Sequence, residues 1–164
     1  RCVGRIYMGY SEKRHVHVTI MGEDTICTLE TAQSSNDKES TGYKVNTRIY
    51  VGDSVYENSK EFDSMEFLII DLQKRLPESV VLACCQTCQH GNFCPFGDNE
   101  DEIFCLHGYS PESKGDVVGI ISKKHTILPY HELLSWCDKY KVINDSAYTY
   151  NDWLYYIDEN GNGR

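Results

Sequence analysis

The stretch SVVLACCQTCQHGNFCPFGDNEDEIFCLHG, residues 79–108, carries the strongest information about the fold of this chain. It begins with an apolar run, Ser79 to Ala83, that is typical of a buried strand. The run leads directly into a cluster of cysteines, because most of the 8 cysteines of the chain lie between positions 84 and 105. The loop between them is rich in Gly, Asn and Asp, and burial of apolar side chains alone cannot order such a loop. The cysteines are therefore the candidates for holding this segment together.

Four of these cysteines have the spacing of a metal site, Cys85-x2-Cys88-x5-Cys94-x10-Cys105. The short gap between Cys85 and Cys88 lets both thiolates turn toward one ion while nearby backbone amides donate to the sulfurs. Four thiolates make a closed tetrahedral shell, which suits Zn²⁺ and needs neither redox change nor an open position. We therefore predict one structural zinc ion bound by Cys85, Cys88, Cys94 and Cys105. The substitute ligands are Cys84, His90 and His107.

Two other interpretations of the cysteine cluster stay open. In an oxidising compartment the cysteines could form disulfides, although the adjacent pair Cys84-Cys85 does not favour this. Alternatively Cys85 and Cys88 could form a redox pair, but such pairs usually open a helix, and this one follows a strand and enters a turn-rich loop. The three remaining cysteines, Cys2, Cys27 and Cys137, are predicted to be buried apolar thiols.

The first third of the chain has the alternation of an antiparallel sheet. Val16, Val18 and Ile20 alternate with polar residues, and the same pattern recurs from Val45 to Val51. Turns are expected at Gly22-Glu23-Asp24 and at Gly52-Asp53. From Glu61 to Leu76 the apolar spacing changes to three and four residues, which predicts one long amphipathic helix that Pro77 ends.

The remaining residues complete a single α+β domain over residues 1–164. We expect an antiparallel sheet with the long helix packed on it, then a zinc-stapled loop and a C-terminal helical segment. Within that segment Val117 to Ser122 predicts a short strand, and Pro129 to Tyr140 predicts a helix with proline in its first turn. The parts are a β-rich part at 1–57, the helix at 61–76, the metal-binding loop at 84–108 and the C-terminal segment at 109–164.

Charge limits the class of partner. Lys and Arg number 16 and Asp and Glu number 25, so the formal net charge is −9. A surface of this sign repels nucleic acids and anionic membranes and favours a basic protein partner. The sequence has no apolar run of the roughly 20 residues that a membrane helix needs and no signal-peptide pattern. The expected location is the cytoplasm.

Residues 79–105 resemble an uncharacterised bacterial family. The features that carry the resemblance are the buried strand, the C-x2-C pair, the element Phe93-Cys94-Pro95-Phe96-Gly97 and the dipeptide Phe104-Cys105. Members pair a β-rich N-terminal part and a helix with a motif of the type C-x2-C-x5-Y-x-P-x-G followed by C-F, so the resemblance extends over residues 5–108. It implies metal binding and an association with toxin-immunity genes. The family has a non-cysteine residue before the proline, so Cys94 is either an added ligand or a bystander, with Cys84 completing the site.

Together these observations favour a non-enzymatic, zinc-stabilised, acidic protein-binding domain. The specific hypothesis is an immunity protein that neutralises a cationic toxin. The sequence carries no phosphate-binding glycine loop, dinucleotide fingerprint or nucleophile elbow. The alternative is a metal-dependent enzyme or thiol oxidoreductase that uses the cysteine cluster.

Overall fold

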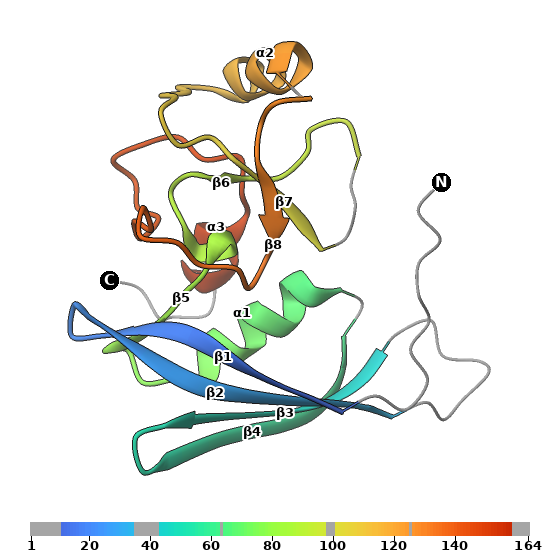
Figure 1. Ribbon diagram of the computed structural model, residues 1–164, viewed down its shortest axis with the longest axis vertical. Helices are drawn as coiled ribbons and strands as arrows, with labels where there is room; N and C mark the ends of the chain where they lie inside the picture. Colours follow the sequence, from blue (N-terminus) through green and yellow to red (C-terminus); the bar gives the residue numbers. More distant parts are fainter. Residues whose placement is uncertain (1–10, 35–42, 63, 98–100, 125, 159–164) are drawn as a thin grey trace.

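The computed structural model describes residues 11–34, 43–62, 64–97, 101–124 and 126–158, and it has the expected α+β class. A five-stranded antiparallel sheet forms one layer, and helix α1 lies across it (Figure 1). Above this layer stands a second unit built around a small three-stranded sheet. We call this second unit, residues 84–151, the cysteine lobe.

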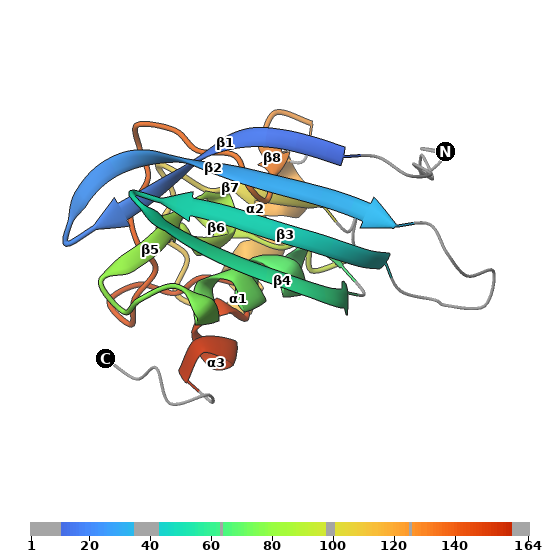
Figure 2. The ribbon, with the colours of Figure 1, turned by 90° about the horizontal axis from the view of Figure 1, so that it is seen from below.

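The large sheet has the strand order β4-β3-β2-β1-β5, so its first four strands form a meander and β5 adds to the β1 edge. Two tight turns connect the hairpins, one at Gly52-Asp53 as predicted and one at Met21-Gly22, so that Glu23 and Asp24 of the other predicted turn belong to β2. Met21 and Gly22 adopt positive φ values of 52° and 89°, and Gly52 adopts 57°. The sheet curves across the molecule with α1 behind it (Figure 2). The strands are β1 (Ser11–Ile20), β2 (Glu23–Ser34), β3 (Tyr43–Val51), β4 (Ser54–Phe62) and β5 (Val80–Ala83).

Helix α1 spans Met65–Arg75 and is shorter than the predicted helix over 61–76. The first predicted residues belong to β4 instead, because Phe62 pairs with Tyr43 of β3. Ser64 then starts the helix, since its side chain accepts a hydrogen bond from the backbone N–H of Phe67. The prediction of one long helix was therefore wrong in length, although its position and its buried face were right.

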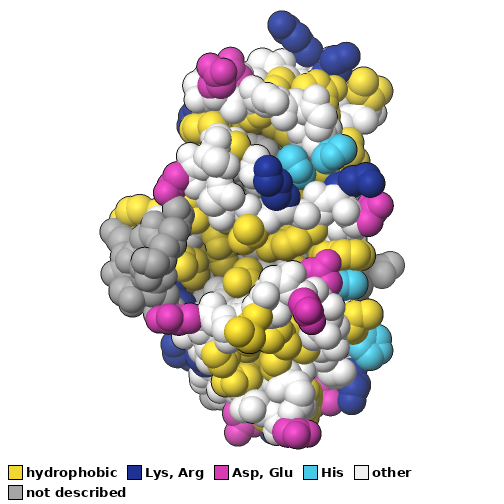
Figure 3. Space-filling model, turned by 90° about the vertical axis from the view of Figure 1, so that its left-hand side faces the viewer, with side chains coloured by type: hydrophobic (Ala, Val, Ile, Leu, Met, Phe, Trp, Pro, Cys, Tyr) yellow, Lys and Arg dark blue, Asp and Glu magenta, His cyan; other side chains and the backbone are white. Residues whose placement is uncertain are grey.

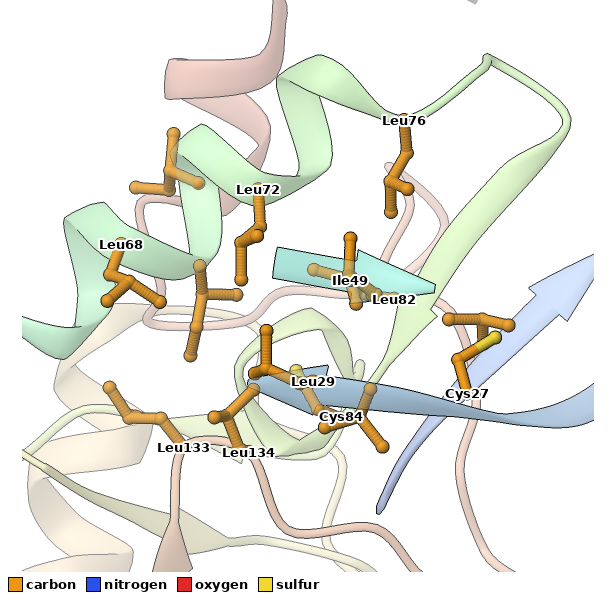
Figure 4. Close-up of a cluster of buried hydrophobic side chains, with 14 of the residues drawn as sticks. Cys27, Leu29, Ile49, Leu68, Leu72, Leu76, Leu82, Cys84, Leu133 and Leu134 are labelled. Atoms are coloured by element: carbon orange, nitrogen blue, oxygen red, sulfur yellow. The ribbon is translucent and has the colours of Figure 1, made fainter. Parts of the chain in front are cut away.

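The apolar face of α1 packs on the sheet and forms the main core. Leu72 is fully buried and lies opposite Leu29 and Ile49 from the central strands (Figure 4). The period-2 pattern of the strands and the period-3.6 pattern of the helix supply the two apolar faces that this layer needs. Leu133 and Leu134, from the cysteine lobe, join the same cluster, so the two units share a core.

A cluster of charged residues joins α1 to β4. Asp71 accepts hydrogen bonds from Asn58 and Lys60, both at 2.8 Å, and pairs with Arg75 one helical turn away. Burial would raise the pKa of the Asp71 carboxyl, but the hydrogen bonds and the positive charges of Arg75 and Lys60 outweigh burial and lower it. Because folding lowers the pKa of Asp71, its charged contacts stabilise the fold fully at pH values above its pKa in the unfolded chain. This stabilisation is lost as pH falls through its pKa in the folded state.

Replacing Asp71 with asparagine is expected to lower the free energy of unfolding by about 1–2 kcal/mol at pH 7, because charged hydrogen bonds are lost. The difference from the wild type should shrink at a pH below 3.8, the ordinary pKa of an aspartate, because the pKa of Asp71 is lowered and its charged contacts are lost as pH falls through it. Urea denaturation at both pH values measures this. Asp53→Asn, at an exposed turn residue, is the matched control and should change little. A loss of unfolding free energy that is equal at both pH values would contradict this dependence on the ionisation of Asp71.

The cysteine lobe contains the remaining elements. Its small sheet has the order β6-β7-β8, and helix α2 packs on a second apolar cluster that includes Phe104, Leu106 and Val117. None of the helices in the described ranges is both long and apolar enough to span a bilayer. The elements after β5 are the 3₁₀ helix η1 (Cys85–Thr87), β6 (Gly91–Asn92), β7 (Glu102–Cys105), α2 (Lys114–Lys124), β8 (Tyr130–Glu132) and α3 (Trp153–Asp158).

Two predicted elements of the C-terminal segment were wrong. The strand expected at Val117 to Ser122 lies inside α2, where Ser113 caps the helix by accepting from the N–H of Asp116 at 3.2 Å. The helix expected at Pro129 to Tyr140 is instead β8 followed by turns, because this stretch pairs with β7 through Ile103 and His131. The strand expected at Ser79 to Ala83 is confirmed as β5.

Candidate metal centre

The cysteine motif lies where the large sheet passes into the cysteine lobe. Strand β5 ends at Ala83, and η1 turns the chain so that the Cys88 N–H donates to the Cys85 carbonyl at 3.3 Å. The Gly91 N–H then donates to the Cys88 carbonyl at 2.9 Å. Gly91 pairs with Cys105, which places β7 beside the C-x2-C turn although the two are far apart in sequence.

A small cavity of about 40 Å³ lies beside this turn. Cysteines 85, 88 and 105 line it, and so does Cys137 from the loop after β8. His90 and His131 also line this cavity. As the side chains lie, no three His, Cys, Asp or Glu residues of the described part are arranged to hold an ion. The fold thus brings four thiols to one cavity without drawing them into a coordination shell.

The structure places the other predicted ligands elsewhere. Cys94 packs against the second apolar cluster, which includes Phe104 and Leu106. Cys84 is 2% exposed in the main core, where Thr87 is its hydrogen-bonding neighbour. His90 and His107 stack edge to face with ring centroids 5.0 Å apart. The prediction that Cys85, Cys88, Cys94 and Cys105 bind zinc remains a prediction, and the structure gathers only three of these residues at one cavity.

Burial in this cavity disfavours the thiolate form of two of its cysteines, Cys85 and Cys105. Burial, together with repulsion from Cys84, Cys88, Cys105 and Cys137, raises the pKa of Cys85 to about 12. Burial also raises the pKa of Cys105, and a hydrogen bond from the backbone of His107 partly offsets this rise. A thiol with a raised pKa is a poor nucleophile, which does not favour a redox pair at Cys85 and Cys88.

The cysteines outside the motif follow the sequence prediction only in part. Cys27 is buried at 5% exposure, as predicted, and Cys2 lies outside the described residues. Cys137 is exposed, so its prediction as a buried apolar thiol was wrong. Its sequence surroundings contain no second cysteine at metal-ligand spacing, so only the tertiary structure relates it to the motif. All seven described cysteines carry free thiols.

A larger cavity of about 480 Å³ adjoins the first. His90 lines both cavities, and the larger one is otherwise bordered by Gln89, Asn92 and the loops around Tyr109 and Asp145. The side-chain oxygen of Gln89 is buried, and it has no hydrogen-bond partner among the described residues. This cavity provides room for a small molecule next to the cysteine turn.

Comparison of the chain with protein-family models, with curated proteins and with solved structures finds no match. The resemblance to the bacterial family with the C-x2-C motif therefore stays a prediction from the sequence.

Proposed function

We propose that this chain is a non-enzymatic protein-binding domain whose cysteine lobe is held by a structural zinc ion. The observation that carries the proposal is the single cavity lined by Cys85, Cys88 and Cys105 at the junction of the two sheets. A cation there would stabilise the thiolates that otherwise repel one another, and it would join β7 to the C-x2-C turn. The role of the ion is to fix the binding surface rather than to supply chemistry.

The partner we propose is a cationic protein, and the specific case is a bacterial toxin neutralised in the cytoplasm. The net charge of −9 supports this choice of partner class. Figure 3 shows Asp and Glu side chains distributed over both parts of one face rather than collected in one patch. A negative electrostatic potential spread over the surface in this way attracts a basic protein over a broad area and speeds its association with this domain.

Binding to a cationic partner is expected to depend strongly on salt. Raising the ionic strength from about 0.05 M to 0.5 M should weaken the complex by about tenfold or more, because screening removes the attraction between opposite charges. The test is calorimetric titration of the purified protein with the cationic products of its adjacent genes. A neutral protein of similar size is the control. An affinity that does not change with ionic strength would contradict the proposed partner class. Failure to bind any of these products would contradict it too.

A metal-dependent enzyme is the second candidate, and the 480 Å³ cavity that shares His90 with the cysteine cavity favours it. An enzyme would keep an open coordination position on the ion, whereas a structural site is closed. Co²⁺-substituted protein separates the two cases. Added azide changes the visible spectrum of an open site and leaves that of a closed four-thiolate site unchanged.

A further inference from the structure

We propose that Cys137, rather than Cys94, is the fourth ligand of the zinc site, which is then formed by Cys85, Cys88, Cys105 and Cys137. This inference rests on the proposed zinc-stabilised domain and names its ligands. On binding, each of the four thiols releases its proton to solvent, and the ion receives four thiolate sulfurs.

The loop that carries Cys137 is tied to the C-x2-C turn at both ends. Before Cys137, the carbonyl of Ser135 accepts from the Cys85 N–H at 2.7 Å. After it, the carbonyl of Lys141 accepts from the Gln89 N–H at 2.7 Å, and Val142 forms a β-bridge with Cys88. The loop between these ties therefore runs alongside the turn, and Cys137 has little freedom to leave the cavity.

The centre of the same loop is also anchored. The Tyr140 N–H donates to the Cys137 carbonyl at 3.0 Å, which closes a tight turn just after the cysteine. The hydroxyl of Tyr140 lies 3.1 Å from the Thr87 hydroxyl, inside the C-x2-C turn itself. Because the backbone is already in place, side-chain rotation is the change that a metal would require of Cys137.

Cys94 packs with a different set of side chains from the thiols that line the cysteine cavity. Successive residues of a strand point to opposite faces, and Phe104 and Leu106 belong to the second apolar cluster with Cys94. Cys105 alternates with these two residues and lines the cysteine cavity together with Ile103, and Phe104 also borders that cavity. Cys94 belongs to the second apolar cluster and does not line the cavity, so we do not count it among the ligands.

An unused hydrogen-bond donor lies at the same cavity. The ring of Trp136 stacks on His17 of β1 with a centroid distance of 3.8 Å and an interplanar angle of 3°. Its indole nitrogen is buried, and within the described ranges it has no hydrogen-bond partner. Trp136 lines the cavity beside Cys137. When zinc is bound, a cysteine thiolate is available to accept a hydrogen bond from the Trp136 indole N–H. Such hydrogen bonds are common around metal-bound sulfurs.

Thiol alkylation of the wild-type protein tests the proposal, since Cys137 is exposed and a bare thiol there reacts readily. The experiment treats the zinc-loaded and the chelator-stripped protein with iodoacetamide and measures modification of each cysteine by mass spectrometry. Bound zinc is expected to slow alkylation of Cys137 by about tenfold or more, because a metal-bound thiolate is a poor nucleophile. Cys94 should be protected much less than Cys137, because zinc shields it only by keeping the cysteine lobe folded.

A matched pair of variants, Cys137→Ser and Cys94→Ser, provides the second measurement. Elemental analysis should find one zinc per chain in Cys94→Ser and less metal, or metal that a chelator removes faster, in Cys137→Ser. Full zinc content together with unprotected Cys137 would overturn the assignment of this ligand and leave the zinc-stabilised domain standing. A wild-type protein that binds no zinc, or one with its sulfurs oxidised in pairs, would overturn both.

Discussion

Removal of the zinc ion is expected to lower the melting temperature by about 20 °C, or to unfold the cysteine lobe outright. Structural zinc sites contribute roughly 10–16 kcal/mol of apparent binding free energy in small domains, and about half of that already corresponds to such a shift in a chain of this size. The proposed site joins the C-x2-C turn, β7 and the loop of Cys137, which otherwise depend on a few backbone hydrogen bonds.

Differential scanning calorimetry with and without a chelator measures this change. Re-addition of Zn²⁺ should restore the original melting temperature, and Mg²⁺, which prefers oxygen ligands, should not. Most side chains of the main core come from the five-stranded sheet and α1, so part of the circular dichroism of the folded state should survive. A melting temperature that is identical with and without chelator would contradict a structural role of the metal.

Gly91→Ala is expected to destabilise the fold by about 3 kcal/mol or more, which corresponds to a loss of about 6–12 °C in melting temperature. A methyl group at Gly91 would collide with the Cys85 carbonyl group, and it would lie 3.0 Å from Cδ1 of Ile103. Neither the backbone of the C-x2-C turn nor the buried Ile103 can move away cheaply. The variant therefore separates η1 from β6, and its metal affinity should fall as well.

Gly119→Ala is the matched control for this substitution. Gly119 lies inside helix α2, and apart from its chain neighbours and the backbone of its own helix nothing lies within 4 Å of the position where its Cβ would be. Alanine there should stabilise the protein by about 0.5–1 kcal/mol, because glycine has the poorer helix propensity. Chemical denaturation of both variants provides the comparison. A Gly91→Ala protein as stable as the wild type would show that the contact between η1 and β6 is loosely packed.

The same close contact shows that the candidate site depends on β6 and β7 as well as on the C-x2-C turn. Gly91 pairs with Cys105, so the approach of β6 to the Cys85 carbonyl also decides how near β7 comes to the C-x2-C turn. The proposed ligands therefore depend on a backbone contact that carries no metal-binding residue. A protein-binding surface on the cysteine lobe would depend on it too.

The elements that could be predicted from the sequence are those whose patterns are local. Alternation around Val16 and Ile49 predicted the strands, because one face of each strand must be buried, and the apolar spacing around Leu72 predicted the buried face of α1. The C-x2-C spacing also predicted Cys85 and Cys88 as candidate metal ligands. Prediction failed where a short apolar run fits both the strand period and the helix period. Val117 to Ser122 was predicted as a strand and lies in helix α2.

Which other thiols lie near that pair depends on contacts between segments that are distant in sequence. Cys94 is close to Cys88 in sequence but packs against the second apolar cluster, whereas Cys137 is distant in sequence, lines the cavity, and belongs to a loop that pairs with the turn. The physical reason is that hydrogen bonds between distant segments, such as Cys85 to Ser135, set the position of Cys137. Hydrogen bonds between distant segments produce no periodic pattern in the sequence of either segment.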